Sequence, residues 1–328
     1  MEHTTVERVG RVFPAVADAS FDAQALSTRD PELLKYERQV RGRPRQRQTS
    51  QTRLTPSARL RHAIEHDELS LHYQPQYETG GGHHCGVEAL ARWFLPKGGS
   101  IAPTTFVPAA EKNGLISALG AWVLGEACTT VATWHRCGAE SPTLCVNVSP
   151  RQISPEFCAV IASALERSGL PAAQLELEIT EGILIERPDL ALHCLAQWKH
   201  LGVRIALDDF GTGYSSLSYL SRLPVDRLKI DKSLIRRMTS DPKTAAIVRA
   251  VISLGADLGF VVLAEGVESE AQLAMLSGMG CQQVQGYLFA LPACADEARA
   301  LLASDWGSRA IPRPFLPMRS ATGSSYAF

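Results

Sequence analysis

Eight strand-like runs recur along this chain, and helical patterns separate most of them. The runs are apolar and lie at Leu69–Tyr77, Gly86–Trp93, Pro142–Val148, Gln174–Thr180, Val203–Phe210, Arg227–Asp231, Phe260–Val267 and Cys281–Phe289. The helical patterns lie at Ser117–His135, Ser154–Ser168, Pro188–His200, Ser215–Ser221, Pro242–Leu258, Ser269–Ser277 and Ala295–Ala303. This alternation is typical of an α/β protein with a parallel sheet, and eight units within about 240 residues favour a closed barrel. An open, doubly wound sheet is the alternative.

Polar side chains occur at or near the ends of six of these runs. They are Glu88, Asn147, Glu178, Asp208, Asp209, Lys229 and Glu265. An unpaired carboxylate in an apolar strand costs several kcal/mol or shifts its pKa strongly, and one lysine cannot neutralise five carboxylates. A divalent cation is the expected counter-charge, and oxygen ligands suit Mg²⁺ or Mn²⁺. Because the carboxyl ends of barrel strands open on one face, we expect these groups to converge there.

The pattern within two runs refines this expectation. Side chains alternate between the two faces of a strand, so Glu178 should point into the barrel while Leu177 and Ile179 face the helices. Asp208 and Asp209 would point apart in a regular strand, but the glycines that follow allow the chain to turn so that both reach one site. Adjacent aspartates fit a two-metal arrangement. Taken alone, such a pair is more typical of a turn or a helix cap.

Composition and length limit the remaining possibilities. The chain has 328 residues, 45% of them hydrophobic, and a net charge of −1, which indicates a globular protein and gives no reason to expect a nucleic-acid polymer as partner. Eight cysteines without C-x-x-C spacing predict reduced thiols and a cytoplasmic location. No run reaches the length of about 18–20 apolar residues that a membrane span needs.

Three parts are expected along the chain. Residues 1–54 read as an extension whose arginine-rich portion, Arg41–Arg53, is a solvated linker, with phosphate binding as the lesser alternative. Residues 55–304 form the barrel domain. The tail 305–328, rich in Pro, Ser, Arg and Gly, is expected to be poorly ordered.

Nine ordered motifs resemble those of one known family. The segment Glu88-Ala89-Leu90-Ala91-Arg92-Trp93 matches the signature that names the EAL domain. The other motifs are Tyr73-Gln74-Pro75, the segment from Phe106 to Ile116, Asn147-Val148-Ser149, Glu178-Ile179-Thr180-Glu181, Asp208–Leu217, Lys229–Ser233, Glu265-Gly266-Val267-Glu268 and Gln285–Phe289. The resemblance covers about residues 57–303.

The resemblance implies a fold and an activity. Family members are modified TIM (β/α)₈ barrels with one antiparallel strand, and active members use two Mg²⁺ or Mn²⁺ ions to open cyclic di-GMP to linear pGpG. One ion would be held by Glu88, Asn147, Glu178 and Asp208, and the other by Asp208, Asp209 and Glu265. Catalytic roles fall to Glu88, Lys229 and Glu265, and the dinucleotide would be contacted by Gln74, Leu90, Arg92, Asp209, Lys229 and Gln285.

The resemblance also implies features around the site. Glu181 and Glu268 would anchor the loop after Asp209, and the barrel would form a homodimer. A regulatory partner at the N-terminal segment is a further expectation. The competing hypothesis is a degenerate domain that binds cyclic di-GMP as a receptor without hydrolysing it; a scaffold acting through the basic segment is a third. A glycosidase needs only two carboxylates and would leave Asn147 and Lys229 unexplained.

Overall fold

The computed structural model describes residues 56–66, 68–96, 98–136, 142–182, 187–211, 220, 222–303 and 306. The contacts divide the chain into Met1–Pro56 and Ser57–Phe328, and the second unit carries the described elements. The predicted linker and nearly all of the predicted tail lie outside the described residues, as does the helical pattern at Ser215–Ser221 apart from Leu220.

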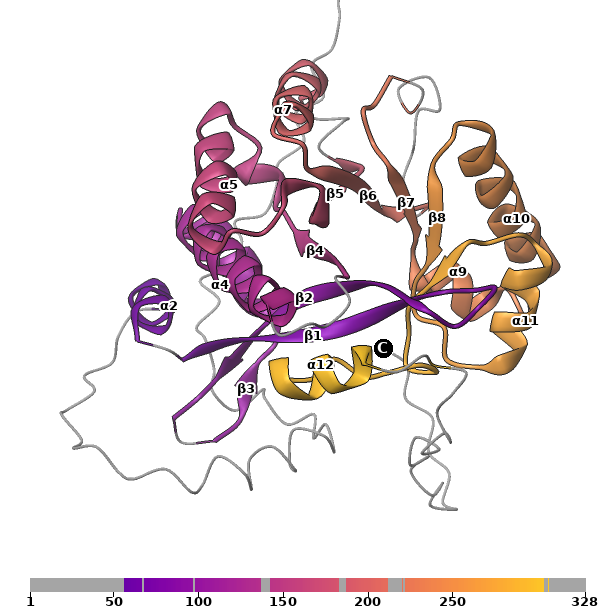
Figure 1. The fold of residues 1–328 in the computed structure, drawn as a ribbon, viewed down its shortest axis with the longest axis horizontal. Helices are drawn as coiled ribbons and strands as arrows, with labels where there is room; N and C mark the ends of the chain where they lie inside the picture. Colours follow the sequence, from indigo (N-terminus) through magenta and orange to yellow (C-terminus); the bar gives the residue numbers. More distant parts are fainter. Residues whose placement is uncertain are drawn as a thin grey trace, which may run out of the picture. The chain divides into compact units, whose positions relative to one another are not determined.

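Eight strands close into a barrel, as the sequence predicts (Figure 1). They are β1 (Leu69–Glu78), β2 (His84–Phe94), β4 (Thr143–Asn147), β5 (Leu175–Thr180), β6 (Arg204–Phe210), β7 (Arg227–Ile230), β8 (Val261–Ala264) and β9 (Gln283–Val284). Neighbours from β2 through β9 pair in parallel, whereas β1 closes the barrel antiparallel to both β2 and β9. The barrel with one antiparallel strand is therefore confirmed, and the open sheet is wrong.

Helices cover the outside of the barrel and connect its parallel strands (Figure 1). They are α2 (Pro56–Glu65), α3 (Pro103–Lys112), α4 (Ile116–Arg136), α5 (Pro155–Ser168), α7 (Pro188–His200), α9 (Lys232–Arg237), α10 (Pro242–Asp257), α11 (Glu270–Gly278) and α12 (Ala295–Leu302). A short strand, β3 (Ser100–Ile101), extends the sheet beside β2. Two 3₁₀ turns, η1 (Pro150–Gln152) and η2 (Ala172–Gln174), complete the described elements.

Local sequence signals set several helix ends. Asp241 caps α10 by accepting a hydrogen bond from the backbone of Lys243, directly before the proline at the first helical position. Ser269 and Gln272 form a reciprocal capping box at the start of α11. These caps satisfy backbone groups that a helix end otherwise leaves unpaired.

Apolar side chains lie between the barrel wall and the helices. Leu175, Leu177 and Ile179 of β5 are buried in this layer, as period-two alternation predicts, and Leu228 and Ile230 of β7 join them. A second cluster lies under α2 and α3 and includes Leu60, Trp93 and Phe106. Since the apolar core lies outside the strands, the polar side chains on their other face are enclosed in the barrel lumen.

The structure differs from the sequence prediction at some elements. The last strand was expected over Cys281–Phe289 but is only Gln283–Val284, because the chain turns at Gln285 to place its side chain in the barrel mouth. The helices α2, α3 and α9 were not predicted. Within the described residues, α4 has the length and composition of a membrane span; about half of that stretch is buried, and Leu124, Ala127 and Val131 pack in the barrel core.

Candidate active site

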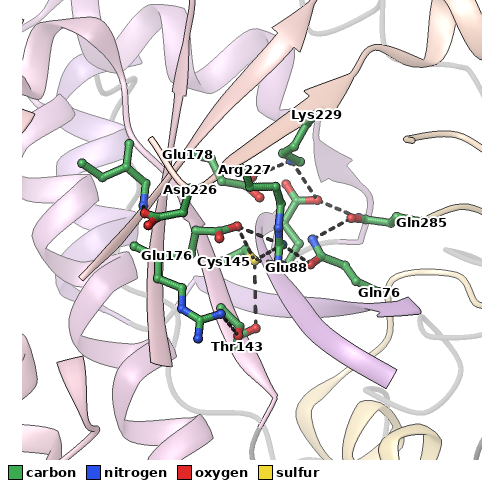
Figure 2. A network of polar contacts seen from close by, with 12 residues as sticks. Gln76, Glu88, Thr143, Cys145, Glu176, Glu178, Asp226, Arg227, Lys229 and Gln285 are labelled. Atoms are coloured by element: carbon green, nitrogen blue, oxygen red, sulfur yellow. Dashed lines mark hydrogen bonds and ion pairs between the residues drawn. The ribbon is translucent and has the colours of Figure 1, made fainter. Parts of the chain in front are cut away.

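Lys229 is buried among several carboxylates, and Figure 2 shows it beside Glu178 and Glu88. Its ammonium nitrogen lies 2.7 Å from Oε2 of Glu178 and 2.7 Å from Oε1 of Glu265. It also lies 3.3 Å from Oδ1 of Asp208 and 4.0 Å from Oε2 of Glu88. These side chains come from five different strands or strand ends, and period-two alternation aims each of them inward. The structure thus brings together groups that are up to 177 residues apart, from Glu88 to Glu265.

Glu88 is held from two sides by amide groups. Asn147 donates from Nδ2 to Oε1 of Glu88 over 2.6 Å, and Gln285 donates from Nε2 to Oε2 over 2.7 Å. Glu88 is buried, whereas Asn147 is exposed at the end of β4. The hydrogen bond between Glu88 and Asn147 therefore connects the barrel interior to its open mouth.

Asp208 and Asp209 both reach the site because the backbone leaves the regular strand geometry there. The pairing of β6 with β7 shifts register between Leu207 and Phe210. Asp209 adopts a left-handed conformation with φ of 55°, and Gly211 follows with φ of 96°. Aspartate is among the few non-glycine residues that tolerate this region. Carboxylate oxygens of Asp208, Asp209 and Glu265 consequently lie within 4.8 Å of one another.

Burial and mutual repulsion control the protonation of these groups. Burial raises the pKa of Glu178 well above its usual value, and the neighbouring carboxylates add to the rise despite Lys229. Burial likewise raises the pKa of Glu265 to about 8 and that of Asp209 above its usual value. Glu88 behaves differently: burial is outweighed by Lys229 and by hydrogen bonds from Gln285 and Asn147, so its pKa is lowered. The carboxylates raise the pKa of Lys229 far enough to keep it cationic.

The remaining predicted substrate contacts surround this centre. Gln74 faces Glu88 across the β1–β2 pairing, and its Oε1 accepts a hydrogen bond from Gln285. Leu90 and Arg92 follow Glu88 at intervals of two along β2, so they continue the same face toward the end of the strand. Both are partly buried. Their predicted contact with a dinucleotide stays a prediction.

Two residues, Glu181 and Glu268, were predicted to anchor the loop that follows Asp209. Glu181 is buried directly after β5, and Glu268 is exposed before α11. The backbone amide of Glu268 donates to Oε1 of Gln272 over 2.7 Å. The loop at residues 212–219 that they were predicted to hold lies outside the described residues, so the anchoring role stays a prediction.

Sequence reasoning missed a second layer of polar groups beneath the first. Arg227 Nη1 lies 2.9 Å from Oε1 of Glu176 and donates to Oε1 of Gln76 over 2.8 Å (Figure 2). Cys145 lies beside them, with Sγ 3.5 Å from Oε1 of Glu176. Each of these residues is two positions from a site residue in the same strand, so alternation was the signal that could have found them. The lumen is therefore polar over two successive layers.

The donor set fits a bound divalent cation. In the described structure, Oε1 of Glu178 is buried without a hydrogen bond, and Oδ1 of Asp208 is buried with only the 3.3 Å ion-pair contact to Lys229. Four carboxylates lie within 4.0 Å of the Lys229 ammonium nitrogen, and Asp209 joins Asp208 and Glu265 beside them. Three of these five groups, Glu178, Asp209 and Glu265, have raised pKa values, as expected for acidic groups that lack sufficient counter-charge. Oxygen-only ligands of this kind suit Mg²⁺ or Mn²⁺. The acidic site can therefore hold metal. In the deeper layer, the cation of Arg227 already neutralises Glu176.

Fold and site together define a class: a (β/α)₈ barrel with an acidic, metal-compatible site at the carboxyl ends of its strands. The family model of the EAL domain matches residues 57–292. The chain belongs to the EAL-domain family. A solved structure described as the PaMucR phosphodiesterase in complex with c-di-GMP is similar, with a TM-score of 0.72 and 43% identity, covering 75% of this chain and 100% of that one.

Curated relatives are similar over the same region. MucR of Pseudomonas aeruginosa, a bifunctional diguanylate cyclase/cyclic di-GMP phosphodiesterase, is 43% identical over 245 residues, which are 74% of this chain and 36% of MucR. An uncharacterized signaling protein of Caulobacter vibrioides is 47% identical over 239 residues, 72% of this chain and 29% of that protein. The chain thus spans well under half the length of these relatives.

Proposed function

We propose that this protein is a metal-dependent phosphodiesterase that hydrolyses cyclic di-GMP to linear pGpG and so lowers the level of a bacterial second messenger. The observation that carries the proposal is the group of carboxylates around Lys229, in which Asp208, Asp209 and Glu265 lie within 4.8 Å of one another. The phosphodiesterase activity named for MucR supports the same assignment.

The proposed metal site holds two ions, Mg²⁺ or Mn²⁺. Glu88, Asn147, Glu178 and Asp208 would bind one, and Asp208, Asp209 and Glu265 would bind the other. Two such ions would activate a water molecule and stabilise charge at the attacking and leaving oxygens.

Side chains of the protein would position the metal ligands, the attacking water and the substrate. Lys229 Nζ holds Oε2 of Glu178 and Oε1 of Glu265 in place, and it stays cationic, so it can also bind a phosphate oxygen or the attacking water. Gln285 Nε2 donates toward the same space. Gln74, Leu90 and Arg92 extend from the centre along β1 and β2, where they would contact the dinucleotide.

The setting of the reaction is part of the proposal. We place the protein in the cytoplasm, where reduced thiols are stable; each of the seven cysteines in the described residues is free. We also propose a homodimer that forms through the barrel, and a regulatory partner that acts through the N-terminal segment.

The test is incubation of the full chain with cyclic di-GMP and Mg²⁺, followed by separation of the nucleotides. We expect conversion to pGpG, loss of conversion in excess EDTA, and recovery with Mg²⁺ or Mn²⁺ but not with Ca²⁺, whose longer and looser coordination misplaces the water. Binding of cyclic di-GMP without conversion at any tested metal concentration would instead identify a receptor. Undiminished turnover after complete metal removal would reject the metal mechanism.

A further inference from the structure

A chain of hydrogen bonds connects the deeper polar layer to Glu88. Gln76 Nε2 donates to Oε1 of Gln285 over 2.9 Å, and Gln285 Nε2 donates to Oε2 of Glu88 over 2.7 Å (Figure 2). At the deeper end, Oε1 of Gln76 accepts from Arg227 over 2.8 Å. Gln76 and Gln285 are both buried, at 0% and 4% exposure, so these hydrogen bonds are shielded from bulk solvent.

The ends of this chain fix the direction of every hydrogen bond in it. A carboxamide can in principle be rotated by half a turn, which exchanges its donor and its acceptor. Arg227 carries only donors and is permanently charged, so Gln76 must turn its oxygen toward Arg227 and its NH₂ group toward Gln285. Gln285 must then turn its oxygen to Gln76 and its NH₂ group to the active site.

The lower end is itself held firmly. Glu176, which is 1% exposed, pairs with Arg227. Burial lowers the pKa of the Arg227 guanidinium, but the negative charge of Glu176 and its neighbours outweighs this, so the pKa is raised. Gly86 provides the space for the Gln76 carboxamide: a Cβ atom at position 86 would lie 2.5 Å from Oε1 of Gln76. The hydrogen-bond chain therefore has space reserved for the Gln76 carboxamide beside Gly86, and the charged Arg227 orients that carboxamide.

We propose that Arg227 and Gln76 are positioning residues that orient the Gln285 carboxamide, so that Gln285 presents its NH₂ group, and not its carbonyl, to Glu88 and the reacting phosphate. This inference rests on the proposed phosphodiesterase function. Its consequence is that Gln285 acts in the site as a hydrogen-bond donor only. Gln74 supports the same orientation from above, because its Oε1 accepts from Gln285 and its Nε2 donates to the carbonyl of Ala290.

The test reverses the polarity of the link without changing its shape. Gln76→Glu is nearly isosteric and keeps a partner for Arg227, but it presents an acceptor to the Gln285 oxygen. Gln76→Met removes the link without reversing it. We expect kcat to fall about tenfold in Gln76→Met and further in Gln76→Glu, while KM changes less than about twofold. A residue that only fills space would give the opposite order, with the isosteric glutamate milder than methionine.

A double-mutant cycle separates positioning from general electrostatic or packing effects. In a Gln285→Met background, both substitutions at position 76 should lose their effect on kcat. They should also lose their effect on the Mg²⁺ concentration that gives half of the maximal thermal shift, which is a measurement that needs no turnover. Equal losses in both backgrounds, or wild-type kcat in Gln76→Glu, would overturn the proposal.

Two further variants complete the design. Gly86→Ala removes no polar group but displaces the Gln76 carboxamide, so it should resemble Gln76→Met. If the variants at position 76 do not fold, Gly86→Ala enters the same cycle, and an unchanged kcat there contradicts the proposal. Ile161→Val in the α5 core, at 0% exposure, is the control for lost packing and should keep the wild-type kcat. Failure of the wild-type chain to hydrolyse cyclic di-GMP would reject the proposed function separately.

Discussion

The ammonium nitrogen of Lys229 lies 2.7 Å from Oε2 of Glu178, and both side chains are fully enclosed in the barrel lumen. Two positions earlier in each strand, Arg227 and Glu176 form a similar pair at 2.9 Å. The strand registers place Glu178 level with Ala206, and Ala206 level with Arg227, so Lys229 lies two residues further along β7 than the residue level with its partner. The barrel thus carries two stacked ion pairs, of which the upper one belongs to the proposed active site and the lower one supports it.

Replacing Glu88 with Ala should lower kcat by more than about 100-fold, because the substitution removes a proposed metal ligand and the acceptor for both Asn147 and Gln285. The fold should survive, since Glu88 lies at the barrel mouth and not in the apolar core. Steady-state turnover and circular dichroism would test both statements. Glu270→Ala, an exposed change at the start of α11, is the control and should have no effect. Near-normal turnover of the Glu88 variant would show that this residue binds no essential metal.

Replacing Arg227 with Met should destabilise the protein by about 3–5 kcal/mol, because Glu176 would remain as a buried charge without its cation. The double variant Arg227→Met/Glu176→Met should recover much of that loss. Chemical denaturation would measure both free energies of unfolding. Lys199→Met is the control: its partner Asp226 is 38% exposed, so the cost should stay below about 1 kcal/mol. Equal costs for the two single variants would contradict the role of burial.

The stability of the metal-free protein should fall as the pH rises from about 5 to 8. Burial raises the pKa of Glu265 from 4.5 to about 8, so the folded state holds this proton more tightly than the unfolded state does. The resulting stabilisation is complete below the unfolded pKa and is lost as the pH rises through the folded value. Added Mg²⁺ should therefore raise the Tm more at pH 8.5 than at pH 6. Glu265→Gln should flatten this pH dependence; an unchanged slope in that variant would assign it to other groups.

The left-handed conformation of Asp209 should restrict what can replace it. Asp209→Val places a β-branched residue at φ of 55° and should cost about 1–3 kcal/mol. Asp209→Asn should keep stability within about 0.5 kcal/mol, because asparagine tolerates this region, yet it should weaken the thermal shift produced by Mg²⁺. Thermal melts with and without Mg²⁺ would check both outcomes. A valine variant as stable as the asparagine variant would show that the conformation is not strained.

Much of the fold followed from local patterns. The helix at Pro188–His200 begins and ends where the sequence predicts, and seven of the eight predicted strands lie within a few residues of their observed bounds. The predicted length of the last strand was wrong because the apolar run Cys281–Phe289 does not indicate where pairing with β8 stops. In the structure this pairing ends at Val284. The short helices α3 and α9 escaped notice because tertiary packing, and not their own periodicity, stabilises them.

The sequence by itself determined the alternation of strands and helices, the polar residues at the strand ends and the family motifs, because these depend on residues close together in the chain. Only the tertiary structure decided how those residues meet. The antiparallel β1 places Gln76 deeper than Gln74, so one strand serves both polar layers. The chain from Arg227 through Gln76 to Gln285 joins positions 151 and 209 residues apart. Barrel closure creates such contacts, and no local pattern encodes them, because alternation specifies a face and not the partner across it.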